Sequence, residues 1–304
     1  MRRRPIRTAA TVASSVLALG LLAACGSEDS GTTAESGGSG GGGGESKSLT
    51  IGYIPWDEDI AVTYLWQHVL EEEGYDVKIQ QLDVAPTFAG LAQGDLELFF
   101  DTWLPVTHED YWAQYGEKIE DLGVWYDQAT LNIAVPEYVD AESIADLQGM
   151  ADKFGGTITG IEAGAGLTRV TEEEAMPAYG LDEYKLQTSS TTAMLAELSR
   201  AIEAKEPIVV TLWHPHWAYS AFPIKDLEDP KGAMGDAEEI HVVGREGFTK
   251  DFPELAAALG EFTMDDDRLG SLENVVLREY QDDPAAGVDA WVAENQAWVD
   301  GLME

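Results

Sequence analysis

Short apolar runs alternate with longer amphipathic segments along most of this chain, and that alternation limits its possible folds more than any other feature. Residues 49–54, 76–82 and 96–100 have the length and apolar content of buried strands. Residues 57–74 and 87–93 carry apolar side chains at helical spacing, and Asp57 is the expected N-cap of the longer helix. Strand–helix–strand repetition is typical of an α/β fold, so we expect a mainly parallel sheet covered by helices.

The same rhythm continues in the second half of the chain. Strands are expected at residues 131–135, 157–161, 207–212 and 239–243. Residues 191–205 form an amphipathic helix, and further helices run from Lys250 to the C-terminus. We interpret this as two α/β lobes, with the C-terminal helices returning to the first. The expected lobes are residues 48–134 plus 239–304, and residues 135–238.

The first residues have the pattern of a targeting segment rather than of a folded element. Residues 1–25 combine a basic start with an apolar stretch and end in Leu22-Ala23-Ala24-Cys25, so we interpret them as a secretory signal peptide. Those last four residues resemble the lipobox of bacterial lipoproteins, which implies that Cys25 is lipidated and holds the protein on the outer face of the cell membrane. A plain signal peptide with a chance cysteine is the alternative. Residues 26–47 are rich in Gly and Ser and are expected to be a flexible tether.

Charge and cysteine content exclude several classes of protein. The chain has 56 Asp and Glu against 18 Lys and Arg, a net charge of −38. Nucleic-acid affinity comes from Lys and Arg displacing counterions, so we expect no nucleic-acid partner. The single cysteine can form neither an internal disulfide nor a cysteine-based metal site.

Signatures of catalysis are mostly absent. The chain has no Walker A or H-E-x-x-H motif. His214-Pro215-His216 could contribute to a zinc site, but a proline-fixed turn is the simpler reading. The run Glu172-Glu173-Glu174 is expected to be a solvated helix face rather than a pair of catalytic carboxylates. We therefore expect no catalytic residues, no metal and no cofactor.

Three tryptophans follow predicted strands closely: Trp56, Trp103 and Trp213. Ligands of open α/β sheets bind at the carboxyl ends of the strands, and indole faces attract cations. The three rings could pack only against other parts of the protein, or they could form an aromatic cage for a quaternary ammonium group. Gly164-Ala165-Gly166 follows a strand and opens a helix, which is either a tight turn or an anion site made of backbone N–H groups.

Five segments together resemble one family, in the same order along residues 49–260. They are residues 52–57 (GYIPWD), 101–108 (DTWLPVTH), 160–166 (GIEAGAG), 211–217 (TLWHPHW) and 227–232 (LEDPKG). This set is similar to the glycine betaine-binding proteins of osmoprotectant ABC importers. The resemblance implies a two-lobed periplasmic-binding-protein fold of type II, with a ligand cleft between the lobes. It also implies a monomer that delivers its ligand to membrane-bound permease subunits.

The resemblance also implies a ligand set. Trp56 and Trp103 of the first lobe and Trp213 of the second would enclose the trimethylammonium group. The backbone N–H groups of Gly166 and Leu167 would hold the ligand carboxylate, and His108 matches a family histidine near that carboxylate. Other branches have an aromatic residue near position 164, which this loop lacks. Glycine betaine is the expected ligand, with choline, carnitine or proline betaine as alternatives, and a surface-anchored hydrolase as a different class of function.

Overall fold

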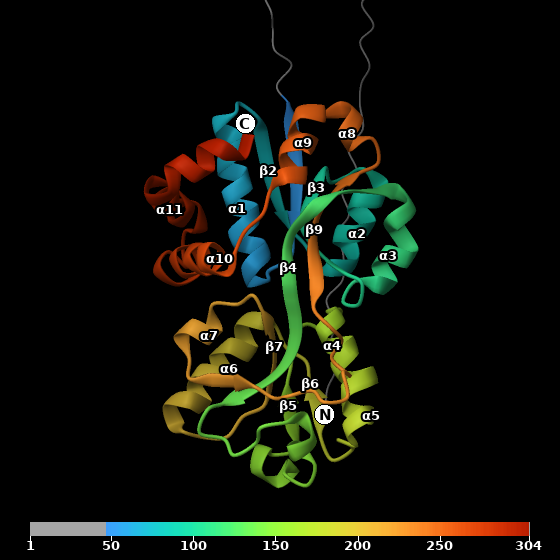
Figure 1. Ribbon diagram of the computed structural model, residues 1–304, viewed down its shortest axis with the longest axis vertical. Coiled ribbons are helices and arrows are strands. Elements are labelled where there is room, and N and C mark those ends of the chain that lie inside the picture. The colour runs from blue at the N-terminus through green and yellow to red at the C-terminus, as the bar shows by residue number, and fades with distance from the viewer. Residues whose placement is uncertain (1–46, 304) are drawn as a thin grey trace, which may run out of the picture. The chain divides into compact units, whose positions relative to one another are not determined.

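The computed structural model describes residues 47–303, so the predicted signal peptide, most of the predicted tether and Cys25 lie outside it. The strands follow the order β2-β1-β3-β9-β4-β7-β5-β6, and β8 pairs with β4 (Figure 1). The strands are β1 Ser48–Tyr53, β2 Asp76–Gln81, β3 Leu98–Leu104, β4 Ile119–Pro136, β5 Thr157–Thr159, β6 Lys185–Gln187, β7 Val210–His214, β8 Ile224–Asp226 and β9 Glu238–Arg245.

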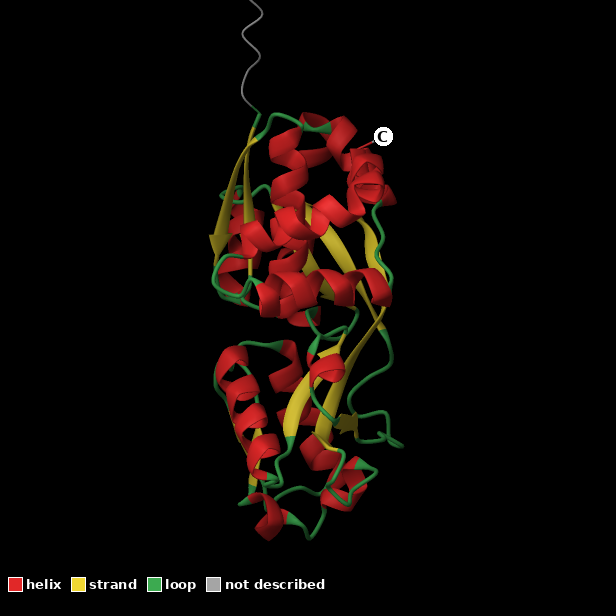
Figure 2. Ribbon diagram, turned by 90° about the vertical axis from the view of Figure 1, so that its left-hand side faces the viewer, coloured by secondary structure: helices red, strands yellow, loops and turns green. Residues whose placement is uncertain are grey.

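Helices pack against the strands at both ends of this order, around β1 to β3 and around β5 to β7 (Figure 2). They are α1 Asp57–Glu72, α2 Val84–Gln93, α3 Glu109–Tyr115, α4 Gly166–Val170, α5 Met176–Tyr179, α6 Thr191–Ala204, α7 Ala218–Ala221, α8 Phe248–Asp251, α9 Pro253–Glu261, α10 Asp266–Glu273 and α11 Pro284–Val299. A π-helical segment, Thr171–Ala175, joins α4 to α5. None of the helices in residues 47–303 is both long and apolar enough to cross a bilayer.

The strand β4 belongs to two sheets. Residues from Ile119 to Ala129 pair with β9 in the sheet that contains β1, β2 and β3. From Thr130 to Pro136, β4 pairs with β7 and β8 in the sheet that contains β5 and β6. The prediction of a strand at residues 131–135 was therefore too short, because it covered only the most apolar stretch of β4.

The expectation of a mainly parallel sheet was wrong. Four pairs are parallel: β1–β2, β1–β3, β5–β6 and β5–β7. Strand β4 pairs antiparallel with β7, β8 and β9, and β9 also pairs antiparallel with β3. The chain leaves the first sheet along β4 and returns to it along β9, so these adjacent strands must run in opposite directions.

The core of the first sheet is aromatic. The Trp66 ring lies 5.7 Å from Phe100 and 5.2 Å from Phe262, and the Trp66 and Phe100 side chains are fully buried. Helices α10 and α11 pack on α1, so the C-terminal helices return to the first sheet. This packing fixes α1 and β3, so it positions Trp56, the residue before α1, and Trp103 on β3.

Candidate functional site

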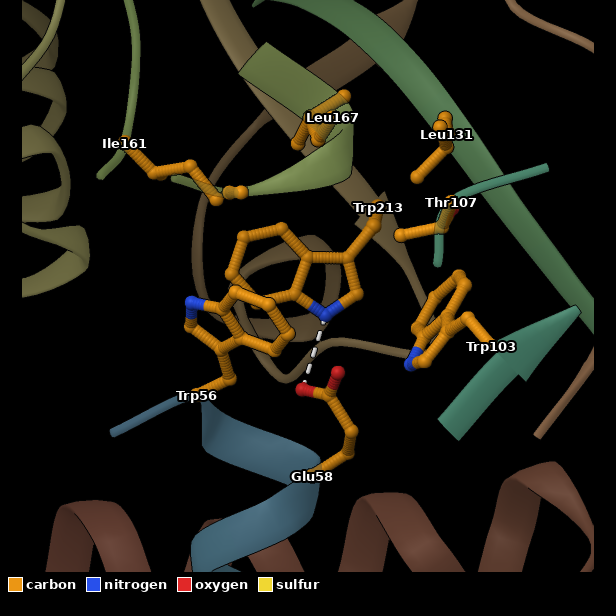
Figure 3. A pocket seen from close by; sticks show the side chains of 9 residues that line it. Trp56, Glu58, Trp103, Thr107, Leu131, Ile161, Leu167 and Trp213 are labelled. Atoms are coloured by element: carbon orange, nitrogen blue, oxygen red, sulfur yellow. Dashed lines mark hydrogen bonds between the residues drawn. The ribbon is translucent and has the colours of Figure 1, made fainter. Parts of the chain in front are cut away.

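The three tryptophans singled out in the sequence line one pocket where the two sheets meet (Figure 3). Trp56 precedes α1, Trp103 lies near the end of β3, and Trp213 lies near the end of β7. About 260 Å³ between the residues that line this pocket is not filled by atoms, including space that is open to solvent. The lining residues are Trp56, Glu58, Trp103, Thr107, Leu131, Ile161, Ala165, Leu167 and Trp213.

Each of the three indole N–H groups donates to a carboxylate. Trp213 Nε1 donates to Glu58 Oε2 at 2.9 Å, and Trp103 Nε1 donates to Asp101 Oδ1 at 2.7 Å. Trp56 Nε1 donates to Glu162 Oε2 at 3.3 Å. Bonds to ionised acceptors are stronger than neutral ones. These bonds fix the ring orientations, so that the ring faces rather than the polar edges are available to a ligand.

The carboxylates beneath the pocket are buried. Glu58 is 1% exposed, and Asp101 and Glu273 are fully buried. Burial, and then the charges of Asp101 and Glu273, raise the pKa of Glu58 well above its usual range. Burial also raises the pKa of Asp101 to about 7, although the bond from Trp103 opposes the shift. The wall of the pocket therefore holds carboxyl groups that are costly to ionise unless a cation lies nearby.

The predicted N-cap of α1 was wrong by one residue. Trp56 is the N-cap, and Asp57 is the first residue of the helix. The Asp57 carboxylate does not cap the helix because it accepts from Trp217 Nε1 at 2.5 Å and lies 3.3 Å from His216 Nε2. Asp57 thus connects α1 to the segment that follows Trp213.

At the other end of the pocket, the start of α4 approaches the loop after β3. Leu167 lines the pocket and is 3% exposed, whereas Gly166 lies directly behind the lining. A Cβ atom on Gly166 would stand only 2.0 Å from Thr107 O, so this contact requires glycine. The first N–H groups of a helix have no acceptor within it, which makes those of Gly166 and Leu167 available to an anion.

His108 lies behind the cage rather than in its lining. Its ring is fully buried and stacks on Trp56 at 5.7 Å, with 8° between the ring planes. Its Nδ1 accepts from the Trp103 backbone N–H at 2.9 Å, and its Nε2 has no partner among the described residues. Burial, helped by the charge of Arg169, lowers the pKa of His108 to about 3. His108 is therefore neutral, and Nε2 carries the ring proton as a free donor.

The His214-Pro215-His216 motif has other partners than a metal. His214 Nε2 lies 2.8 Å from Asp226 Oδ2, and His216 Nδ1 accepts from the Ala218 backbone N–H. Within residues 47–303, no group of three or more His, Cys, Asp or Glu side chains is arranged to hold a metal ion. The acidic run Glu172-Glu173-Glu174 is exposed on the helical stretch after α4.

Sequence reasoning missed the acidic partners of the indoles: Glu58, Asp101 and Glu162. Two of these acids lie within two residues of a singled-out tryptophan: Glu58 follows Trp56, and Asp101 precedes Trp103. That proximity could have drawn attention to them. Which acid binds which indole could not be predicted from the sequence, because Glu58 accepts from Trp213, which is 155 positions away.

Comparison with known proteins identifies relatives across most of the chain. A model of the substrate binding domain of the ABC-type glycine betaine transport system matches residues 47–294. The glycine betaine/carnitine transport binding protein GbuC of Listeria monocytogenes is 38% identical over 161 residues, which are 50% of this chain. That match spans about half, 52%, of the length of the Listeria protein.

Two solved structures share the fold. Lactococcal OpuAC, in its closed form complexed with glycine betaine, has a TM-score of 0.78 at 33% identity and covers 85% of this chain and 100% of its own. The glycine/betaine/L-proline-binding protein ProX from Borrelia burgdorferi has a TM-score of 0.80 at 33% identity, covering 85% of this chain and 97% of its own. The predicted periplasmic-binding-protein fold is thereby confirmed, and this chain belongs to the family of substrate-binding domains of ABC-type glycine betaine transport systems.

Proposed function

We propose that the protein is the extracytoplasmic binding component of an ABC importer and that its ligand is glycine betaine. The observation that carries this proposal is the convergence of Trp56, Trp103 and Trp213 on one pocket. A quaternary ammonium group cannot donate a hydrogen bond, so only π faces or carboxylates can hold it. A cage of indoles next to a buried carboxylate provides both.

The energetics require a second contact besides the cage. A desolvated cation–π contact contributes about 2 kcal/mol, so three rings contribute on the order of 6 kcal/mol. Micromolar affinity corresponds to about 8 kcal/mol, and association itself has a cost. The carboxylate of glycine betaine must therefore also be bound.

We assign that carboxylate to the end of the pocket formed by α4. The N–H groups of Gly166 and Leu167 and the free Nε2–H of His108 are the donors proposed for it. Thr107 is a poorer candidate, because its hydroxyl already donates to Glu238 Oε1 at 2.5 Å. Carnitine is the second ligand we retain, since the Listeria relative is described as a glycine betaine/carnitine binding protein.

The remaining assignments concern the whole protein. We propose that residues 48–134 with 239–304 and residues 135–238 act as two lobes that close on the ligand. We further propose a monomer, lipid-anchored through Cys25, that delivers its ligand to membrane-bound permease subunits without chemical change. Relatives described as transport binding proteins support the absence of an enzymatic role.

Calorimetric titration of the purified protein tests the function. We expect glycine betaine to bind at one site with micromolar or tighter affinity, and the ligand to be recovered unchanged. Choline, carnitine and proline betaine serve as comparison ligands. Turnover of glycine betaine, or no heat of binding from any of the four with a folded protein, would contradict the proposal.

A further inference from the structure

Two buried carboxyl groups adjoin the cage, and the proposed function leaves their protonation out of account. Glu58 lines the pocket and accepts from Trp213, while Asp101 lies behind Trp103 and accepts from its indole. Figure 3 shows the Glu58 carboxylate turned toward the space between the three indoles. The second oxygen of Asp101, Oδ2, has no hydrogen-bond partner among the described residues.

The groups around this pair are mostly further acids. Asp57 and Asp59 lie beside Glu58 on α1, and Glu273 faces it from α10. Glu273 is fully buried, and among the described residues neither of its carboxylate oxygens has a hydrogen-bond partner. His216 approaches Asp57, with 3.3 Å between Nε2 and Oδ2.

Positive charge near these acids is scarce. Within residues 47–303, no Lys or Arg lies within ion-pair distance of Glu58, Asp101 or Glu273. The Arg278 guanidinium is stacked 5.4 Å from the centre of the Trp217 ring instead. Two buried carboxylates without a cation cannot both ionise cheaply, so the empty pocket retains a proton on this pair. The raised pKa of each group agrees with that conclusion.

We infer that Glu58 is the counter-charge of the quaternary ammonium group, and that binding of this cation expels a proton held by Glu58 or by Asp101. This inference rests on the proposed function, because it requires a permanent cation in the cage. The ligand's charge is fixed at every pH, so the proton leaves the protein for the solvent, and the ionised carboxylate and the cation remain. The Trp213 bond to Glu58 is also stronger once Glu58 is ionised.

The sign of the resulting pH dependence follows from linkage. The free protein binds more protons than the complex between the pKa of the bound form and the higher pKa of the free form. Affinity therefore rises with pH inside that interval and is flat outside it. The pKa of Asp101 in the free protein is about 7, so the interval in which Asp101 releases a proton ends near neutrality. Where Glu58 holds the proton, the raised pKa of Glu58 sets the end of the interval.

Calorimetry of the whole protein with glycine betaine tests the inference. Titrations at about pH 6 and pH 8, each in two buffers of different ionisation enthalpy, give both the dissociation constant and the number of protons released. We expect release of up to about one proton per ligand near the lower pH, and a dissociation constant roughly tenfold smaller at the higher pH.

Substitutions identify the groups responsible. Glu58→Gln keeps an amide oxygen to accept from Trp213 but cannot ionise, so it should bind weakly at both pH values and release no proton. Asp101→Asn should reduce the proton release while leaving Glu58 to hold the cation. Glu71→Gln removes one carboxylate from the exposed, distant end of α1 and should behave as the wild type. His216→Asn tests whether the His216 imidazole is the source of the proton, and this variant should still release a proton when glycine betaine binds.

The outcomes separate this inference from the function on which it rests. If glycine betaine binds equally well at both pH values and no proton is released, the inference is wrong and the proposed function stands. Proton release that persists unchanged in both Glu58→Gln and Asp101→Asn also overturns it. If glycine betaine does not bind the folded protein at any pH, the proposed function fails and the inference falls with it.

Discussion

The indole N–H of Trp213 on β7 donates a 2.9 Å hydrogen bond to the carboxylate of Glu58 on α1. This bond joins the two sheets at the pocket itself, because β7 belongs to one and α1 packs on the other. The next tryptophan, Trp217, makes a parallel contact with Asp57. The same helix start that lines the pocket therefore also holds the second sheet against the first.

Closure should depend on the glycine at position 166. A methyl group there would collide with the Thr107 backbone, at 2.0 Å from its oxygen, and would separate α4 from the loop after β3. We expect Gly166→Ala to lose at least about tenfold in affinity for glycine betaine, although every cage residue is intact. Small-angle scattering should show compaction of the wild type on ligand addition and none in the variant.

Gly164→Ala is the matched control for that experiment. Its added Cβ would lie 3.4 Å from a Val84 methyl group, which is an ordinary contact. We expect this variant to bind and to compact as the wild type does. Equal compaction of Gly166→Ala and the wild type would count against a clamp that closes at α4.

The cage should not distinguish ligands that share a quaternary ammonium group. Trp103→Ala removes one ring face, so we expect glycine betaine and choline each to bind about 30-fold more weakly, equivalent to about 2 kcal/mol. Trp112→Ala removes an indole from α3, which does not line the pocket, and should leave both affinities unchanged. A loss confined to one ligand would show that Trp103 does more than bind the shared group.

Acid should destabilise the protein partly through His108. The folded protein keeps this ring neutral, with its pKa lowered to about 3, whereas the unfolded chain takes up a proton below about 6.5. The stabilisation from a neutral His108 is complete above about pH 6.5 and is lost as the pH falls from there toward 3. We expect this linkage to cost about 2 kcal/mol of unfolding free energy by about pH 5.

His108→Asn isolates that contribution. Its amide oxygen can still accept from the Trp103 N–H, but the side chain does not titrate. Urea unfolding at neutral and acidic pH should therefore show a smaller loss of stability in the variant than in the wild type. Identical losses would mean that His108 is protonated in the folded state as easily as in the unfolded one.

The sequence allowed much of this site to be predicted, for identifiable reasons. Trp56 follows a strongly apolar strand, Trp103 and Trp213 lie near the ends of two others, and the geometry of α/β sheets brings strand ends together. The strands β6 and β8 were missed because each has three residues with a single aliphatic side chain. The strand β5 is equally short, but a second aliphatic residue, Ile161, follows it closely in the sequence.

The antiparallel pairing of β4 and β9 was missed for a different reason. An apolar strand looks the same whichever direction its neighbour runs, so direction depends on the long connections between the sheets. The acids behind the cage were missed because a carboxylate in sequence is read as solvated. Only the fold shows that Glu58 and Asp101 are enclosed by aromatic rings.

The proposed lipid anchor has a direct test. Cys25 lies outside the described residues, and no helix within residues 47–303 can cross a bilayer. If Cys25 carries the anchor, Cys25→Ser should move the protein from the membrane fraction to the medium, with its affinity for glycine betaine unchanged. A variant that remains in the membrane fraction would show that something else retains it.

Ligand choice should depend on the end of the pocket opposite Glu58. Choline shares the quaternary ammonium group with glycine betaine but has a neutral hydroxyl in place of the carboxylate. A buried donor that loses its anion costs about 1–3 kcal/mol, so we expect glycine betaine to bind at least about tenfold more tightly than choline. Equal affinities in the wild type would remove the basis for placing a carboxylate at Gly166 and Leu167.

Two substitutions at Leu167 separate its backbone from its side chain. Leu167→Pro deletes an amide donor in the first turn of α4, where proline is tolerated, and also removes the side chain that lines the pocket. Leu167→Ala removes the side chain and keeps the amide. Because the amide N–H contacts only the ligand carboxylate, the proline variant should bind glycine betaine at least about tenfold more weakly than the alanine variant does. The two variants should bind choline equally, and calorimetry with both ligands measures this. If proline merely distorts the structure, the affinities for glycine betaine and choline should fall by the same factor.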